Sequence, residues 1–169
     1  MMGLDAGGRS ARTRALDHVG IERPLHQEIG LAYFGGCLLK DADKGLADAP
    51  TLRLALKRFY GGAIEVYTSG GAHAVGCYIV CSAIPEAVCN ERVRAKAADV
   101  LRFLDNALEQ RFRRAIDDGE LPAKADPSAL AALAGGILHS LAVRARGGAK
   151  RKELDALAAN AIQMLTTRA

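Results

Sequence analysis

The second half of the chain, residues 90–168, contains three segments in which apolar residues recur at helical spacing. The first segment begins at Asn90, a residue type that caps helix N-termini, and it ends near Asp118, where Gly119 favours a helix C-terminus. Its apolar stripe consists of Val93, Ala97, Val100, Leu104, Leu108 and Phe112. Three consecutive helices fill this half of the chain, so we predict an all-α protein.

The other two segments are bounded by equally clear signals. Asp126 as N-cap and Pro127 at the first helical position predict a helix that runs to about Arg146 and stops at Gly147-Gly148. A last helix runs from about Ala149 nearly to the C-terminus. Both helices are apolar over an arc too wide for one small bundle to cover, so we expect a dimer interface to bury them. The residues expected there are Leu130, Ala134, Leu138, Leu141, Leu157 and Ala161.

The composition favours a helical fold of a single main domain. Half of the 169 residues are hydrophobic but only 5% are aromatic, so the core has to be built from Leu, Ala, Ile and Val. We find no run of about 18 uncharged apolar residues, the length that a membrane span requires. The sequence shows no basic stretch followed by an apolar segment near its start, so we see no secretory signal. We therefore expect a cytoplasmic protein without a membrane span.

The chain divides near residue 45. Residues 1–45 contain several glycines and little apolar periodicity, and we predict a residual N-terminal segment that is either a helix-turn-helix remnant or disordered. Residues 46–169 are predicted to form the main domain. Residues 1–40 hold five basic and four acidic side chains, so their net charge is +1. That is less positive than is usual for a nucleic-acid-binding region.

Two further helices are predicted between residues 51 and 88. Apolar residues at helical spacing from Leu52 to Val66 indicate an amphipathic helix over 51–67. Gly61-Gly62 in its middle lower the helix propensity, and they mark either a kink or a place of close packing. Residues 75–88 are almost wholly apolar, so we expect a buried central helix that Pro85 bends near its end. A strand over residues 77–81 is the alternative.

The cysteines and other reactive residues give no catalytic or metal-binding set. Cys77 and Cys81 are four residues apart and so lie on one helical face, with Cys89 further along. A thiol sensor or soft-metal site is one interpretation, but the spacing is not Cys-x-x-Cys, and buried structural thiols are favoured. Residues 117–120 are interpreted as a solvated helix end rather than a pair of catalytic carboxylates. We predict no cofactor, no metal and no enzymatic activity.

The interior between helices 51–67, 75–88 and 91–118 is the expected place for a small-molecule ligand, because bundle interiors commonly hold such sites. Ordinary core packing is the alternative for each lining residue. The candidate lining residues are Phe59, Ala63, Val66, Tyr67, Cys81, Ile84, Leu104 and Leu108.

Three stretches resemble the tetracycline-repressor (TetR/AcrR) family of bacterial regulators. Gly76-Cys77-Tyr78-Ile79-Val80 is similar to the start of that family's sixth helix. Asp118-Gly119-Glu120-Leu121-Pro122, followed by Asp126-Pro127, resembles the link between its seventh and eighth helices. Residues 135–149 resemble the eighth helix and the turn into the ninth. The resemblance covers residues 50–167 and implies a ligand-binding domain whose last two helices pair with those of a second copy in a four-helix bundle.

The resemblance further implies a homodimeric transcriptional regulator that binds operator DNA and responds to a small apolar effector. The family's three-helix DNA-binding head is expected within about 45 residues before the fourth helix. Only residues 19–24 and 33–35 are similar to it, with Arg23 and Tyr33 as candidate DNA-binding residues, and Gly36-Cys37-Leu38 replaces the expected polar continuation. The predicted head is therefore incomplete or scrambled. The alternative is a ligand-binding and dimerisation protein that does not itself bind DNA.

Overall fold

The computed structural model of the protein describes residues 45–69, 76–77 and 79–167, and within these ranges every regular element is a helix. The elements are α3 (Leu52–Thr68), the π-helical turn η1 (Ile79–Ala83), α4 (Ile84–Glu86), α5 (Glu91–Asp117), α6 (Pro127–Arg146) and α7 (Arg151–Thr166). The predicted all-α fold is confirmed.

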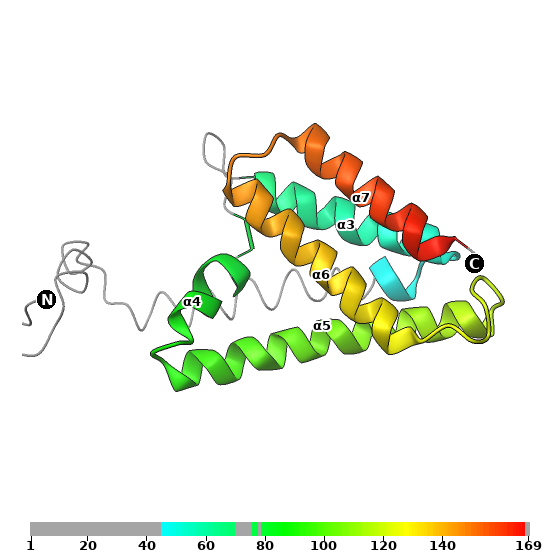
Figure 1. The fold of residues 1–169 in the computed structure, drawn as a ribbon, viewed down its shortest axis with the longest axis horizontal. Coiled ribbons are helices and arrows are strands. Elements are labelled where there is room, and N and C mark those ends of the chain that lie inside the picture. The colour runs from blue at the N-terminus through cyan, green and yellow to red at the C-terminus, as the bar shows by residue number, and fades with distance from the viewer. Residues whose placement is uncertain (1–44, 70–75, 78, 168–169) are drawn as a thin grey trace, which may run out of the picture.

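The helices pack in layers around one apolar core. α6 crosses the molecule between α5 and the pair formed by α3 and α7, and it contacts all three (Figure 1). α3 lies alongside α7, while η1 and α4 lie close to the N-terminal end of α5. The largest fully buried side chains are Tyr60, Tyr67 and Phe112, surrounded by leucines and isoleucines. With Phe59, which is 5% exposed, four aromatic rings therefore supplement the aliphatic core that the composition predicts.

The helix boundaries follow the capping residues. The side-chain oxygens of Thr51, Asn90 and Asp126 accept hydrogen bonds from backbone amides in the first turns of α3, α5 and α6, which satisfies donors that a helix start leaves free. Gly119 has a φ of +71°, as expected for the left-handed residue after a helix. The last helix begins at Arg151, two residues later than the sequence suggests.

The prediction of one buried helix over residues 75–88 is wrong. Residues 79–86 form a π-helical turn followed by the three residues of α4, and Pro85 lies in the first turn of α4. In a regular α-helix the ring of a proline clashes with the carbonyl four residues earlier, and a wider π turn avoids that clash. Ile84 and Val88 are 41% and 80% exposed, because this segment lies at the periphery beside the start of α5.

α3 runs continuously through Gly61-Gly62, so these glycines do not break the helix. A Cβ atom at either position would meet no heavy atom within 4 Å, and the close-packing interpretation of the pair is therefore wrong.

α6 is an exception to the expectation that no segment is apolar enough to span a membrane. An 18-residue window within its 20 residues has a mean hydropathy of 1.4, so α6 passes that test by length and composition. The core helix of a soluble protein passes the same test, and α6 lies between α5 and the α3–α7 pair. Only 39% of its apolar window is buried, however, so a large part of its apolar surface has no cover within one chain.

Candidate functional site

The structure brings most of the predicted ligand-lining residues into one interior. Five of the eight are buried and belong to the common core of α3 and α5: Phe59, Ala63, Tyr67, Leu104 and Leu108. Val66 and Cys81 are half-buried at its margin. Ile84 is 41% exposed, so it does not share this interior, because α4 turns it outward.

One end of the interior, near η1, holds a buried phenol beside a buried thiol. Tyr67 is 1% exposed, and its hydroxyl has no hydrogen-bond partner among the described residues. Burial raises the pKa of Tyr67, and the Cys77 thiol close to it raises that pKa further, although their contact lacks the geometry of a hydrogen bond. Burial also raises the pKa of Cys77. Both groups are therefore held in their protonated forms at neutral pH.

Gly76 lies in close contact with α6 and with the side chain of Cys81. Its φ is +64°, and a Cβ atom there would lie 2.9 Å from the carbonyl oxygen of Ala142 and 3.0 Å from Sγ of Cys81. The Sγ atom of Cys81 itself lies 3.9 Å from the same carbonyl oxygen. Glycine is therefore required at this position, both for its backbone conformation and for the close approach. The sequence analysis noted Gly76 in a motif but gave it no role in the site.

The opposite end of the interior holds an ion pair that the sequence analysis missed. Nη2 of Arg111 lies 3.1 Å from Oε1 of Glu120, and the Arg111 side chain is only 2% exposed. Oε2 of Glu120 accepts a hydrogen bond of 2.6 Å from the backbone amide of Leu52, at the start of α3. The interpretation of Glu120 as part of a solvated helix end is therefore wrong. The sequence signal for this ion pair is Arg111, nine residues before Glu120. The burial of Arg111 depends on the packing of α3, which the local sequence does not show.

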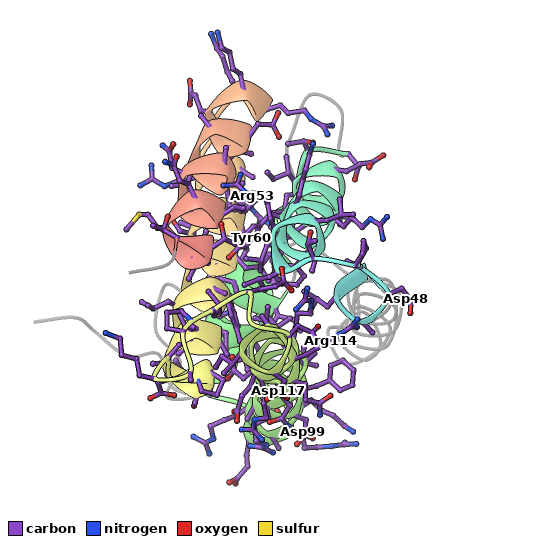
Figure 2. All side chains as sticks on the ribbon, turned by 90° about the vertical axis from the view of Figure 1, so that its right-hand side faces the viewer. Asp48, Arg53, Tyr60, Asp99, Arg114 and Asp117 are labelled. Carbon is purple, nitrogen blue, oxygen red and sulfur yellow. The ribbon has the colours of Figure 1, made fainter. Side chains whose placement is uncertain are left out.

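A second arginine of α5 fixes the segment that precedes α3. Nη1 of Arg114 donates a hydrogen bond of 2.8 Å to the carbonyl oxygen of Ala47, and Figure 2 shows Arg114 facing the segment that carries Asp48. Leu46 and Ala49 in this segment are buried. The end of α5 thus helps to hold the segment before α3 in place.

The residues predicted to form the dimer interface lie mostly inside the protomer. Four of the six are at most 5% exposed in the single chain: Ala134, Leu138, Leu141 and Ala161. Leu130 and Leu157 are half-buried. The large apolar residues that α6 and α7 expose are Leu133, Val143 and Met164, at 62%, 55% and 80% exposure. An Ala- and Leu-rich helix has no polar face, so periodicity did not distinguish its inner side from its outer side.

Other predicted sites find no test in the described residues. Arg23 and Tyr33, the predicted DNA-binding residues, lie outside them.

Within the part of the chain that the structure describes, no group of three His, Cys, Asp or Glu side chains is placed to hold a metal ion. His139 is half-buried on α6, where burial lowers its pKa and the carboxylate of Asp105 opposes that shift.

The sequence and the fold match known regulators. The family model described as "Tetracyclin repressor-like, C-terminal domain" matches residues 55–163. A cysteine mutant of the TetR family transcriptional regulator CifR, complexed with a 26 bp double-strand operator DNA, is 26% identical, with a TM-score of 0.72 over 89% of this chain and 78% of that chain. A TetR transcriptional regulator from Rhodococcus sp. RHA1 is 25% identical, with a TM-score of 0.64 over 93% of this chain and 82% of that chain. No curated protein matches the sequence.

The family match covers well over half of the chain and includes η1, α5, α6 and most of α3 and α7, which are the elements that form the interior. The chain therefore belongs to the TetR family of transcriptional regulators, and its described helices form the tetracycline-repressor-like C-terminal domain.

Proposed function

We propose that the protein is a DNA-binding regulator rather than an enzyme, that it acts in the cytoplasm as a homodimer, and that its helical interior binds a small apolar effector. The observation that carries the proposal is the overlap of 89% of this chain with CifR, whose structure contains operator DNA.

The proposed dimer surface is the outer face of α6 and α7. On α6, Leu133, Gly136 and Val143 lie on the side opposite the buried residues, and on α7 Leu157 and Met164 lie one above the other. Small residues such as Gly136 permit two helices to approach closely. Large apolar groups gathered on one exposed face are typical of an interface. The same face accounts for the apolar surface of α6 that one chain leaves uncovered.

The proposed effector site lies between α3, η1 and α5. The side chains there are mainly apolar, with Phe59 and Ala63 on α3 and Leu104 and Leu108 on α5, and all four belong to one core cluster. An effector that binds one arrangement of these helices more tightly than another shifts the population toward it. If that arrangement spaces the two N-terminal regions unsuitably for the operator, effector binding weakens DNA binding by the same free energy.

The second candidate is a ligand-binding and dimerisation protein that does not bind DNA. It is favoured by the net charge of only +1 on residues 1–40. An electrophoretic mobility-shift assay with DNA from upstream of the protein's own gene separates the two candidates. A shift that weakens as salt is raised supports the regulator, because phosphate contacts release counterions. Absence of a shift at both low and moderate salt supports the second candidate.

A further inference from the structure

Three reactive side chains from separate segments meet at the η1 end of the interior. Tyr67 lies near the end of α3, Cys77 precedes η1 and Cys81 lies within it. We propose that Cys77 and Cys81 form a two-thiol site for a monosubstituted trivalent arsenical, with the Tyr67 hydroxyl beside it. The proposal deepens the proposed function, because it assigns a chemical class to the effector of that interior.

The backbone sets the spacing of the two thiols. The amide of Cys81 donates a hydrogen bond of 2.8 Å to the carbonyl oxygen of Cys77, so the two residues are one helical turn apart. At that spacing the Cβ atoms of two residues lie about 5–6 Å apart on the same side of the turn. A disulfide requires Cβ atoms about 3.5–4.5 Å apart. The pair is therefore too widely spaced for a direct S–S bond, whereas one atom inserted between the sulfurs spans the gap.

The number of available ligands selects the class of inserted atom. Within the described residues no third His, Cys, Asp or Glu side chain joins the pair to make a metal site. A structural zinc site takes four such ligands in tetrahedral geometry, and this pair supplies only two. A monosubstituted trivalent arsenical needs only two thiols, because its carbon substituent occupies the third position. That substituent is apolar, which suits the half-buried Val66 and Val80 packed against the core nearby.

The Tyr67 hydroxyl is a second feature of this site, independent of the thiol spacing. The side chain is 1% exposed, and the hydroxyl has no partner among the described residues. Buried polar groups almost always have a partner, so each exception calls for an explanation. A bound thiolate sulfur can accept a hydrogen bond from this hydroxyl. Cys81 is half-buried, and its weak 3.9 Å contact with the Ala142 carbonyl leaves its sulfur free to react.

The binding step balances without any oxidant or reductant. A hydrated arsenical carries two As–O bonds to hydroxyl groups. Both As–O bonds and both S–H bonds break, two As–S bonds form, and the protons of Cys77 and Cys81 leave with the hydroxyl groups as two water molecules. Arsenic stays trivalent. Burial raises the pKa of Cys77. The raised pKa disfavours reactions in which Cys77 acts alone as a free thiolate nucleophile.

The test uses the full-length, reduced protein and phenylarsine oxide as the probe. We expect intact-mass spectrometry to show one phenylarsenic group per chain on the wild type. Peptide mapping after alkylation with iodoacetamide should show Cys77 and Cys81 protected together, and 2,3-dimercaptopropanol should reverse the protection. This measurement on the wild type does not depend on the folding of any variant. Protection of only one of the two thiols, or of neither, would overturn the proposal.

Variants add matched controls. Cys77→Ser and Cys81→Ser should each lose the adduct, while Cys89→Ser should keep it, because Cys89 is exposed and lies outside the pair. An adduct that persists in Cys81→Ser, or that disappears in Cys89→Ser, contradicts the assignment. Neither measurement involves DNA. If the protein forms the adduct but shifts no DNA, the arsenical site is supported and the proposed regulator function is contradicted. If it shifts DNA but forms no adduct, the regulator function is supported and the arsenical site is contradicted.

Discussion

Arg111 and Glu120 form an ion pair with a separation of 3.1 Å, and the arginine side chain is almost completely buried. The same carboxylate accepts the backbone amide of Leu52, so one side chain joins the end of α5 to the start of α3. Nε and Nη1 of Arg111 have no partner among the described residues, which leaves Glu120 as the principal compensation for a buried positive charge.

We expect Glu120→Gln to destabilise the protein by about 2 kcal/mol, because removing one partner of a buried pair leaves the other charge uncompensated. The 23% exposure of the Glu120 side chain keeps this estimate below the usual range. Urea unfolding measures the loss. Glu109→Gln is the control, since its ion pair with Arg113 is more exposed and should contribute less than about 1 kcal/mol. Equal losses in the two variants would contradict the account.

The two buried tyrosines should respond differently to loss of their hydroxyl groups. The Tyr60 hydroxyl donates a hydrogen bond of 3.0 Å to the carbonyl oxygen of Ala134, and Figure 2 shows Tyr60 within the interior. Tyr60→Phe should therefore cost about 1 kcal/mol of unfolding free energy. Tyr67→Phe removes a hydroxyl without a partner and should be neutral or slightly stabilising. A larger loss in Tyr67→Phe than in Tyr60→Phe, measured by urea unfolding, would show that the assignment of partners is wrong.

Two glycines with opposite surroundings give a second pair of variants. Gly62 is exposed within α3, and a Cβ atom there meets nothing within 4 Å, so Gly62→Ala should stabilise the helix by up to about 1 kcal/mol. Gly76→Ala should destabilise the protein, because its φ is +64° and the added Cβ would lie 2.9 Å from the Ala142 carbonyl oxygen. The melting temperature should rise in Gly62→Ala and fall in Gly76→Ala, relative to the wild type. A decrease in the melting temperature of Gly62→Ala would point to a function of that glycine that one chain does not reveal.

Substitutions on opposite sides of α6 test the proposed dimer surface. Leu133 is 62% exposed, so Leu133→Arg should yield a soluble, folded monomer. Leu138 is 4% exposed, so Leu138→Arg should unfold the protomer, because it buries an unpaired charge. Size-exclusion chromatography with light scattering gives the mass, and circular dichroism gives the helix content. A Leu133→Arg protein that remains dimeric would place the interface elsewhere.

The parts of the fold that local chemistry controls could be predicted from the sequence. α3, α5 and α6 begin where Thr51, Asn90 and Asp126 provide caps, since a cap acts within one helical turn. Features that depend on contacts between distant segments could not. The π turn before Pro85 and the burial of Arg111 both depend on how other elements pack around them.

The candidate site shows the same division. Apolar periodicity placed Phe59, Ala63, Leu104 and Leu108 in the interior, because the inner stripes of α3 and α5 are bounded by charged residues. On α6 both sides are apolar, and only the packing against α3, α5 and α7 shows which side faces inward.

The central claim is that this chain is a regulator that recognises its operator as a dimer. Fluorescence anisotropy with labelled DNA from upstream of its gene, and with a scrambled duplex of the same composition, tests it most directly at two salt concentrations. We expect the upstream DNA to bind at least about 1,000-fold more tightly than the scrambled duplex, with affinity that falls as salt is raised and is lost in Leu133→Arg. Equal affinity for the two duplexes, or no binding by the wild-type protein, would contradict the claim.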